Sequence, residues 1–171
     1  MLWLLADNAG AQMNLHKEAA ARGIDPARLV FAGRLPPESH LARHRLADLF
    51  LDTLPYNAHA TASDALWAGL PLITCRGESF AGRVASSLLN AIGLPELVAS
   101  SLDEYEALIL KLATDVSLLE SIRRKLEQNR LSYPLFDTDR FRRNIEAAYL
   151  TAWDIWQRGE SPRSFRVGPA P

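Results

Sequence analysis

Short apolar segments alternate with helix-compatible segments over the first hundred residues of the chain. The apolar segments predict five strands, the last of them short, at 2–6, 29–32, 48–52, 70–75 and 97–98. The segments between them predict helices at 11–22, 36–46, 61–68 and 79–91. Because strands that alternate with helices build βαβ units, this pattern predicts an α/β fold with a Rossmann-like, mostly parallel sheet flanked by helices.

The last part of the chain carries a different, purely helical pattern. Amphipathic periodicity predicts extra C-terminal helices at 102–113, 115–131 and 138–157. Trp153 and Trp156 lie three residues apart on the last of these, and we expect them to pack it onto the domain or onto a partner domain. The remaining residues are rich in proline and glycine. We therefore expect one domain, 1–159, and a flexible tail, 160–171.

The N-terminal end of the chain lies inside an apolar run, from Leu2 to Ala6, with no cap or leader before it. A buried strand at this place indicates a piece of a longer protein. The length of 171 residues fits one domain.

Composition narrows the classes of function. The 19 Lys and Arg residues balance 20 Asp and Glu residues, and a net charge of −1 argues against binding a nucleic-acid backbone through bulk charge. One cysteine, Cys75, excludes an internal disulfide framework and a Cys-rich zinc site, and we expect it in the core. No apolar run reaches the roughly 18–20 residues that cross a bilayer. These features predict a cytoplasmic protein that binds neither nucleic acid nor membrane.

The segment after strand 48–52 carries the richest candidate chemistry, because ligands of parallel α/β sheets bind beyond the carboxyl ends of strands. His59, Ala60 and Thr61 lie where a helix begins, and the N–H groups and positive dipole end there favour a phosphate. Asp64, one turn later, can accept hydrogen bonds from a ribose diol. The alternative is that Thr61 only caps the helix and Asp64 only complements its dipole.

His40 and Arg43 are a second candidate pair, because a spacing of three places them on one helix face. A flat imidazole can stack on a base, and Arg43 can donate to its carbonyl groups. The alternative is two solvated side chains. We expect His44 and His16 on the surface and Trp67 in the core. No histidine spacing suits a metal, and neither a glycine-rich phosphate motif nor a nucleophile elbow is present.

Three stretches resemble the C-terminal catalytic lobe of the O-GlcNAc transferase / SPINDLY family, in which TPR repeats precede a two-lobed GT-B glycosyltransferase. The stretches are 47–53, 56–69 and 77–85, together with Pro71. The resemblance extends from Leu2 to about Gly159. It implies that this chain is the C-terminal, Rossmann-like half of a GT-B fold and binds the donor nucleotide sugar, usually UDP-N-acetylglucosamine.

The resemblance also implies which residues bind the base. His40 matches the histidine that stacks on uracil. Arg43 and the backbone of Leu35 match the groups that contact the edge of the base.

Four further positions match the residues that bind the rest of the nucleotide. Asp64 matches the ribose-binding aspartate, and His59, Ala60 and Thr61 match the diphosphate-binding start of a helix. Ala60 stands where the family usually has a second threonine, and Pro37 stands where animal members carry a lysine near the ribose. The matches therefore leave the identity of the donor open: it is either a UDP-sugar or, as in the SPINDLY branch, GDP-fucose.

The implied reaction is transfer of N-acetylglucosamine to Ser or Thr hydroxyls of a protein acceptor, with inversion and without a metal or other cofactor. The implied partners are the nucleotide sugar, the acceptor, the N-terminal lobe and the TPR repeats. No catalytic group is assigned in this lobe, and we expect the chain alone to have little or no transferase activity. The alternatives are another GT-B enzyme, such as a nucleotide-sugar epimerase, and a non-catalytic nucleotide-binding or scaffold module.

Overall fold

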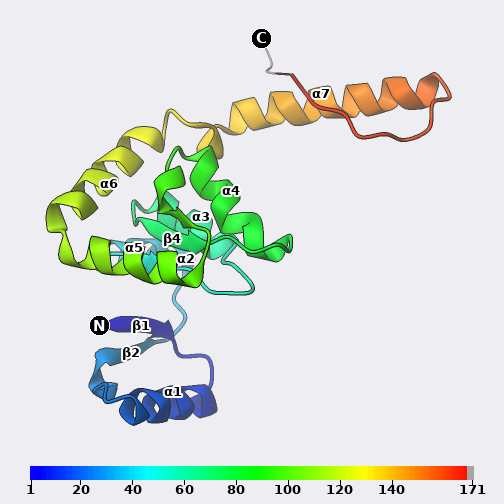
Figure 1. Ribbon diagram of the computed structural model, residues 1–171. Coiled ribbons are helices and arrows are strands. Elements are labelled where there is room, and N and C mark those ends of the chain that lie inside the picture. The colour runs from blue at the N-terminus through cyan, green and yellow to red at the C-terminus, as the bar shows by residue number, and fades with distance from the viewer. Residues whose placement is uncertain (169–171) are drawn as a thin grey trace. The chain divides into compact units, whose positions relative to one another are not determined.

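A computed structural model describes residues 1–168 of the chain (Figure 1). The chain divides into two compact units, Met1–Arg43 and His44–Pro171, each with its own parallel sheet. The single domain 1–159 expected from the sequence remains a prediction. Residues 160–168 contain no helix or strand, and the last three residues of the predicted tail lie outside the described residues.

The first unit is a single βαβ motif followed by a short helix. Its elements are β1 (Leu2–Leu5), α1 (Ala9–Ala21), a 3₁₀ turn (Pro26–Arg28), β2 (Leu29–Ala32) and α2 (Pro37–Arg43). The side chain of Asn8 caps α1 by accepting from the N–H of Ala11 at 2.6 Å, and Gly23 ends the turn after α1 with a φ of +72°. The strands pair in parallel, so α1 is the crossover between them.

The prediction that the first strand is buried is wrong. Leu2, Trp3 and Leu5 are exposed, and only Leu4 is half-buried. In β2, the Phe31 ring meets the edge of His16 from α1, with centroids 5.1 Å apart. The physical reason for the exposure is that a two-stranded sheet has few neighbours, so a run of apolar residues does not suffice to bury it.

The second unit contains a three-stranded parallel sheet in the order β3-β4-β5. The strands are β3 (Phe50–Leu51), β4 (Leu72–Cys75) and β5 (Val98–Ala99). They are connected by α3 (Ala60–Trp67) and by α4 (Val84–Ala91), which follows a 3₁₀ turn at Ala81–Arg83. The central strand is buried at all four positions, which includes Cys75 as expected. A continuous apolar run is typical of such a strand.

Two further helices complete the core of this unit. They are α5 (Leu102–Thr114) and α6 (Val116–Asn129), and the side chains of Ser101 and Asp115 cap them. The core combines residues of β4, α3, α4, α5 and α6 with the turn before β5; its largest side chains are Leu66, Leu72, Ile73, Leu89, Ile92, Leu94, Leu97, Leu112 and Leu126. Burying each such side chain contributes roughly 1.5–3 kcal/mol.

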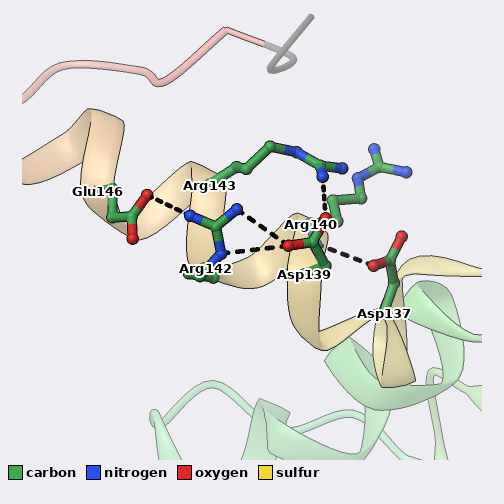
Figure 2. A network of polar contacts seen from close by, with 6 residues as sticks. All are labelled: Asp137, Asp139, Arg140, Arg142, Arg143 and Glu146. Atoms are coloured by element: carbon green, nitrogen blue, oxygen red, sulfur yellow. Dashed lines mark hydrogen bonds and ion pairs between the residues drawn. The ribbon is translucent and has the colours of Figure 1, made fainter.

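The last helix, α7 (Thr138–Gln157), begins in a network of charged side chains (Figure 2). Asp137 caps it by accepting from the N–H of Arg140 at 2.9 Å. Arg142 bridges Asp139 and Glu146, and Arg143 pairs with Asp139 as well. These hydrogen bonds, above all those from Arg142, lower the pKa of Asp139. The pairs are exposed, so each contributes little to stability.

Two expectations about burial are wrong. His44 is 9% exposed, and Trp67 is 46% exposed although we expected it in the core. The predicted helix 36–46 changes after Arg43 into a 3₁₀ turn at His44–Leu46, so the α-helical period no longer gives the face of His44. Trp67 instead lies beside the Phe136 ring and beneath the guanidinium of Arg130, at centroid distances of 5.1 and 5.6 Å.

Candidate functional site

The first unit holds three of the predicted site residues. Arg43 in α2 donates from Nη1 to the carbonyl of Gly33 at 2.8 Å, and its Nη2 lies 2.9 Å from Nδ1 of His40. Because a guanidinium only donates, Nδ1 accepts, and a neutral His40 ring carries its proton on Nε2. Leu35 is exposed in the loop between β2 and α2. The predicted pairing of His40 with Arg43 on one helix face is therefore present.

Arg43 also contacts an aromatic ring. Its guanidinium carbon lies 5.8 Å from the centroid of the Trp3 ring in β1. Together with the bond to Gly33, this contact ties α2 to β1 and to the residue that follows β2. The planar guanidinium next to His40 is thus held by contacts on several sides, which suits a group that donates to a flat ligand.

The second unit holds the other four predicted residues at the start of α3. His59 is the residue before the helix, Ala60 and Thr61 are its first two residues, and Asp64 is half-buried one turn on. Thr61 is therefore not the N-cap, because α3 begins one residue earlier than the pattern predicted. His59 makes no side-chain capping hydrogen bond, and the first intrahelical bond runs from the N–H of Ser63 to the carbonyl of His59 at 3.1 Å. As at any helix start, the N–H groups of the first turn point along the axis and out of the helix, a geometry that suits an anion.

Two aromatic rings flank His59, and sequence reasoning missed their roles. Tyr56 stacks on His59 with centroids 4.8 Å apart and an interplanar angle of 19°, and Phe80 meets the ring edge-on at 6.2 Å. Both Tyr56 and Phe80 are mostly exposed. Nε2 of His59 lies 3.5 Å from the carbonyl oxygen of Ala81, in the loop after β4. The signal available in the sequence was that both rings follow strand ends.

A buried carboxylate lies directly beneath this loop. Asp52, at the end of β3, is 4% exposed and accepts three hydrogen bonds, from Thr53, Ala58 and Thr74. Its backbone carbonyl accepts from the hydroxyl of Tyr105 in α5 at 2.7 Å. Burial, with the nearby charge of Asp52 as a second cause, raises the pKa of Tyr105 to about 12. The phenol therefore keeps its proton, and remains a donor, to a higher pH than an ordinary tyrosine.

Neither a metal nor a membrane function is indicated by the described part of the chain. Among residues 1–168, no three His, Cys, Asp or Glu side chains are grouped as metal ligands would be. No helix in that range is both long and apolar enough to cross a membrane. Taken unit by unit, the candidate groups are His40 and Arg43 in the first unit, and His59 with the N–H groups at the start of α3 in the second.

Comparison with known proteins agrees with these features. Residues 1–145 match glycosyl transferase family 41. A probable UDP-N-acetylglucosamine–peptide N-acetylglucosaminyltransferase SEC of Arabidopsis thaliana is 40% identical over 97% of the chain, and a UDP-N-acetylglucosamine–peptide N-acetylglucosaminyltransferase of Caenorhabditis elegans is 38% identical over 93%. A probable UDP-N-acetylglucosamine–peptide N-acetylglucosaminyltransferase SPINDLY of Hordeum vulgare is 40% identical over 75% of the chain.

A solved structure shows the same fold. A mutant O-GlcNAc transferase of Thermobaculum terrenum matches with a TM-score of 0.85 and 33% identity, over 92% of this chain and 31% of that one. The chain spans only 17% and 14% of the lengths of the Arabidopsis and Caenorhabditis relatives. The predicted parallel α/β fold of the GT-B type and the predicted family are confirmed: this chain belongs to glycosyl transferase family 41, as part of the C-terminal lobe of the O-GlcNAc transferase / SPINDLY group.

Proposed function

We propose that this chain is the nucleotide-sugar-binding lobe of a protein O-GlcNAc transferase, with UDP-N-acetylglucosamine as the donor. The observation that carries the proposal is the start of α3, where His59 precedes a helix whose first N–H groups have no side-chain cap from it. The names of the Arabidopsis and Caenorhabditis relatives support the donor and a peptide acceptor.

The proposed roles follow the chemistry of each group. The N–H groups of α3, the hydroxyl of Thr61 and the imidazole of His59 bind the diphosphate, and Asp64 accepts from the ribose. His40 stacks on the base, and Arg43 with the backbone of Leu35 contacts its edge. When the sugar leaves, negative charge grows on the diphosphate, and dipoles already oriented toward it stabilise that charge without a metal. The sugar is transferred to a Ser or Thr hydroxyl with inversion.

Calorimetry with UDP tests this proposal. We expect the chain to bind UDP, and we expect Asp64→Ala to weaken binding about tenfold or more, because hydrogen bonds to a charged group contribute roughly 1.5–3 kcal/mol. Asp103→Ala is the matched control, since Asp103 lies in the first turn of α5 and has no proposed role. Absence of UDP binding would favour the scaffold alternative.

A second candidate donor is GDP-fucose. The observation that favours it is that Ala60 and Pro37 stand at the two positions that depart from the usual pattern of the family. GDP and UDP compete for the same groups on α3 but differ in the base that His40 contacts. Tighter binding of GDP than of UDP in the same calorimetric series would select the GDP donor.

We further propose that a second lobe of the full-length protein docks on α7. Trp153 and Trp156 are 54% and 67% exposed, and their rings lie 4.8 Å apart. Phe141, Ile145 and Tyr149 continue an exposed apolar face along the helix at spacings of four. A face of this kind marks an interaction surface. The chain alone should therefore show little or no sugar transfer, and robust turnover by the isolated chain would contradict this.

Changing this face tests the docking proposal. Trp153→Ser with Trp156→Ser should leave the unfolding free energy of the chain within about 0.5 kcal/mol, because both rings are mostly solvated. In the full-length protein the same pair of changes should weaken the contact between the two lobes, which would be measured as faster proteolysis of the chain between them. Asp154→Ser is a matched control on the same helix.

A further inference from the structure

We propose that Asp52 is a positioning residue for donor binding, which acts by holding the amide of Ala58 and thereby setting the place of His59 and the start of α3. The inference rests on the proposed function, because the donor is taken to bind there. Asp52 itself touches no part of the proposed donor site; its effect passes through the backbone.

The two carboxylate oxygens of Asp52 accept hydrogen bonds from different parts of the chain. Oδ1 accepts from the N–H of Ala58 at 2.6 Å and from its neighbour Thr53 at 2.9 Å. Oδ2 accepts from the hydroxyl of Thr74 in β4 at 2.6 Å. Thr74 is fully buried, so one oxygen is anchored in the sheet while the other holds the loop. Hydrogen bonds to a carboxylate are stronger than bonds between neutral groups, and both of these bonds are short.

The loop held in this way leads directly into the proposed phosphate site. Ala58 lies one residue before His59, and α3 begins after that. The preceding residues, 53–56, are exposed and have little packing of their own. Without the Oδ1 bond, this part of the loop keeps the bond from the N–H of Asn57 to the carbonyl of Ala81 at 3.1 Å, the bond from the Asn57 side chain to the carbonyl of Thr53 at 3.0 Å, and the stacking of Tyr56 on His59. The bond from the N–H of Ala58 to Asp52 holds the backbone next to His59, so Asp52 acts on the position of His59 alongside the direct contacts of its ring.

The strand end that carries Asp52 is itself fixed from two sides. The N–H of Asp52 donates to the carbonyl of Ile73 at 3.0 Å, and its carbonyl accepts from the hydroxyl of Tyr105 at 2.7 Å. The carboxylate therefore cannot shift much to follow a moving loop. An apolar residue here would avoid the cost of burying a charge but would leave the Ala58 N–H without its acceptor. We infer that the carboxylate serves to hold the loop in place, and that it does not serve to pack the core.

Three variants separate this role from a general contribution to stability. Asp52→Ala removes both bonds to the loop. Asp52→Asn retains an acceptor oxygen for Ala58 and can donate to Thr74 instead. Thr74→Val is the matched control, because it removes the bond to Oδ2 and leaves the bond from Ala58 to Oδ1.

The two measurements are UDP affinity by calorimetry and hydrogen exchange of the Ala58 amide by NMR, on variants whose circular dichroism shows them folded. We expect Asp52→Ala to weaken UDP binding at least tenfold and to speed Ala58 exchange at least tenfold. Thr74→Val should lower the unfolding temperature but change UDP affinity less than threefold. Asp52→Asn should likewise bind UDP within threefold of the unchanged chain.

Several outcomes would overturn the proposal. These are a folded Asp52→Ala that binds UDP like the unchanged chain, equal losses of affinity in Asp52→Ala and Thr74→Val, or a tenfold loss in Asp52→Asn. If Asp52→Ala does not fold, exchange of the Ala58 amide decides: it should be faster in Asp52→Asn, whose neutral oxygen is the weaker acceptor, than in Thr74→Val, and equal rates would overturn the proposal. If the unchanged chain binds no UDP, the proposed function is wrong, whatever the role of Asp52. In that case Ala58 exchange still tests the role of Asp52: an unchanged exchange rate in Asp52→Ala would show that Asp52 does not hold the loop.

Discussion

The hydroxyl of Tyr105 in α5 donates to the carbonyl oxygen of Asp52 at the end of β3, across 53 positions of sequence. The bond places a phenol in a half-buried setting beside a carboxylate. Both burial and that negative charge disfavour the phenolate, so the pKa of Tyr105 rises to about 12. The raised pKa of Tyr105 therefore makes the stability of the second unit depend on pH, and this dependence can be measured.

We expect Tyr105 to ionise only near its raised pKa of about 12, which should be visible as a late step in the phenolate absorbance. Its pKa in the unfolded chain is near 10, so between about pH 10 and 12 the unfolded chain has lost the proton that the folded chain retains. The stabilisation is fully present below pH 10 and is lost as the pH rises through the folded value. Tyr105→Phe should remove the late step, and a late step that persists would contradict the assignment.

The proposed stacking of His40 on the base predicts a loss of affinity on truncation. His40→Ala should weaken UDP binding by about 5- to 150-fold, since stacking a base on an aromatic side chain contributes roughly 1–3 kcal/mol. His16→Ala removes a ring of the same size that packs on Phe31, and should leave UDP affinity unchanged. Calorimetry on both variants checks this, and equal losses would argue against a base contact at His40.

Restoring a hydroxyl at the first residue of α3 should strengthen binding. Ala60→Thr adds a donor beside the proposed diphosphate, and a net hydrogen bond of about 0.5–1.5 kcal/mol predicts a 2- to 12-fold gain in UDP affinity. Ala60→Val has nearly the same shape without the hydroxyl and serves as the control. A gain in both variants would point to shape rather than hydrogen bonding, and no gain in either would place the phosphates elsewhere.

Two glycines with positive φ, Gly23 and Gly93, allow a matched comparison of how much stability a glycine-to-alanine change costs. Gly93 has a φ of +75°, and a Cβ there would overlap the ring of Tyr133, whereas Gly23 has a φ of +72° and nothing within 4 Å of a Cβ. Gly23→Ala should cost only the backbone strain, about 1–2 kcal/mol. Gly93→Ala should cost at least about 1 kcal/mol more, because the ring must move. Denaturant unfolding measures both, and equal costs would show that Tyr133 moves aside freely.

Much of the fold follows from local patterns in the sequence. The predicted strands 29–32 and 70–75 correspond to β2 and β4, and the predicted helix 138–157 is α7 to the residue. Helix starts were less predictable, since Thr61 carries the chemistry of a cap but lies inside α3. The pairing of His40 with Arg43 could be predicted from the sequence, because it depends only on helical spacing within one element.

Other features depend on contacts between distant parts of the chain. Periodicity along the sequence specifies which residues share a helix face or a strand and in what order these elements follow, because those properties are set by the backbone geometry of neighbouring residues. Periodicity did not predict the exposure of Trp67, the burial of His44 or the hydrogen bonds that Asp52 accepts from Ala58 and Thr74. Burial and hydrogen-bond partners arise when elements pack, and packing joins residues whose separation along the chain carries no periodic signal.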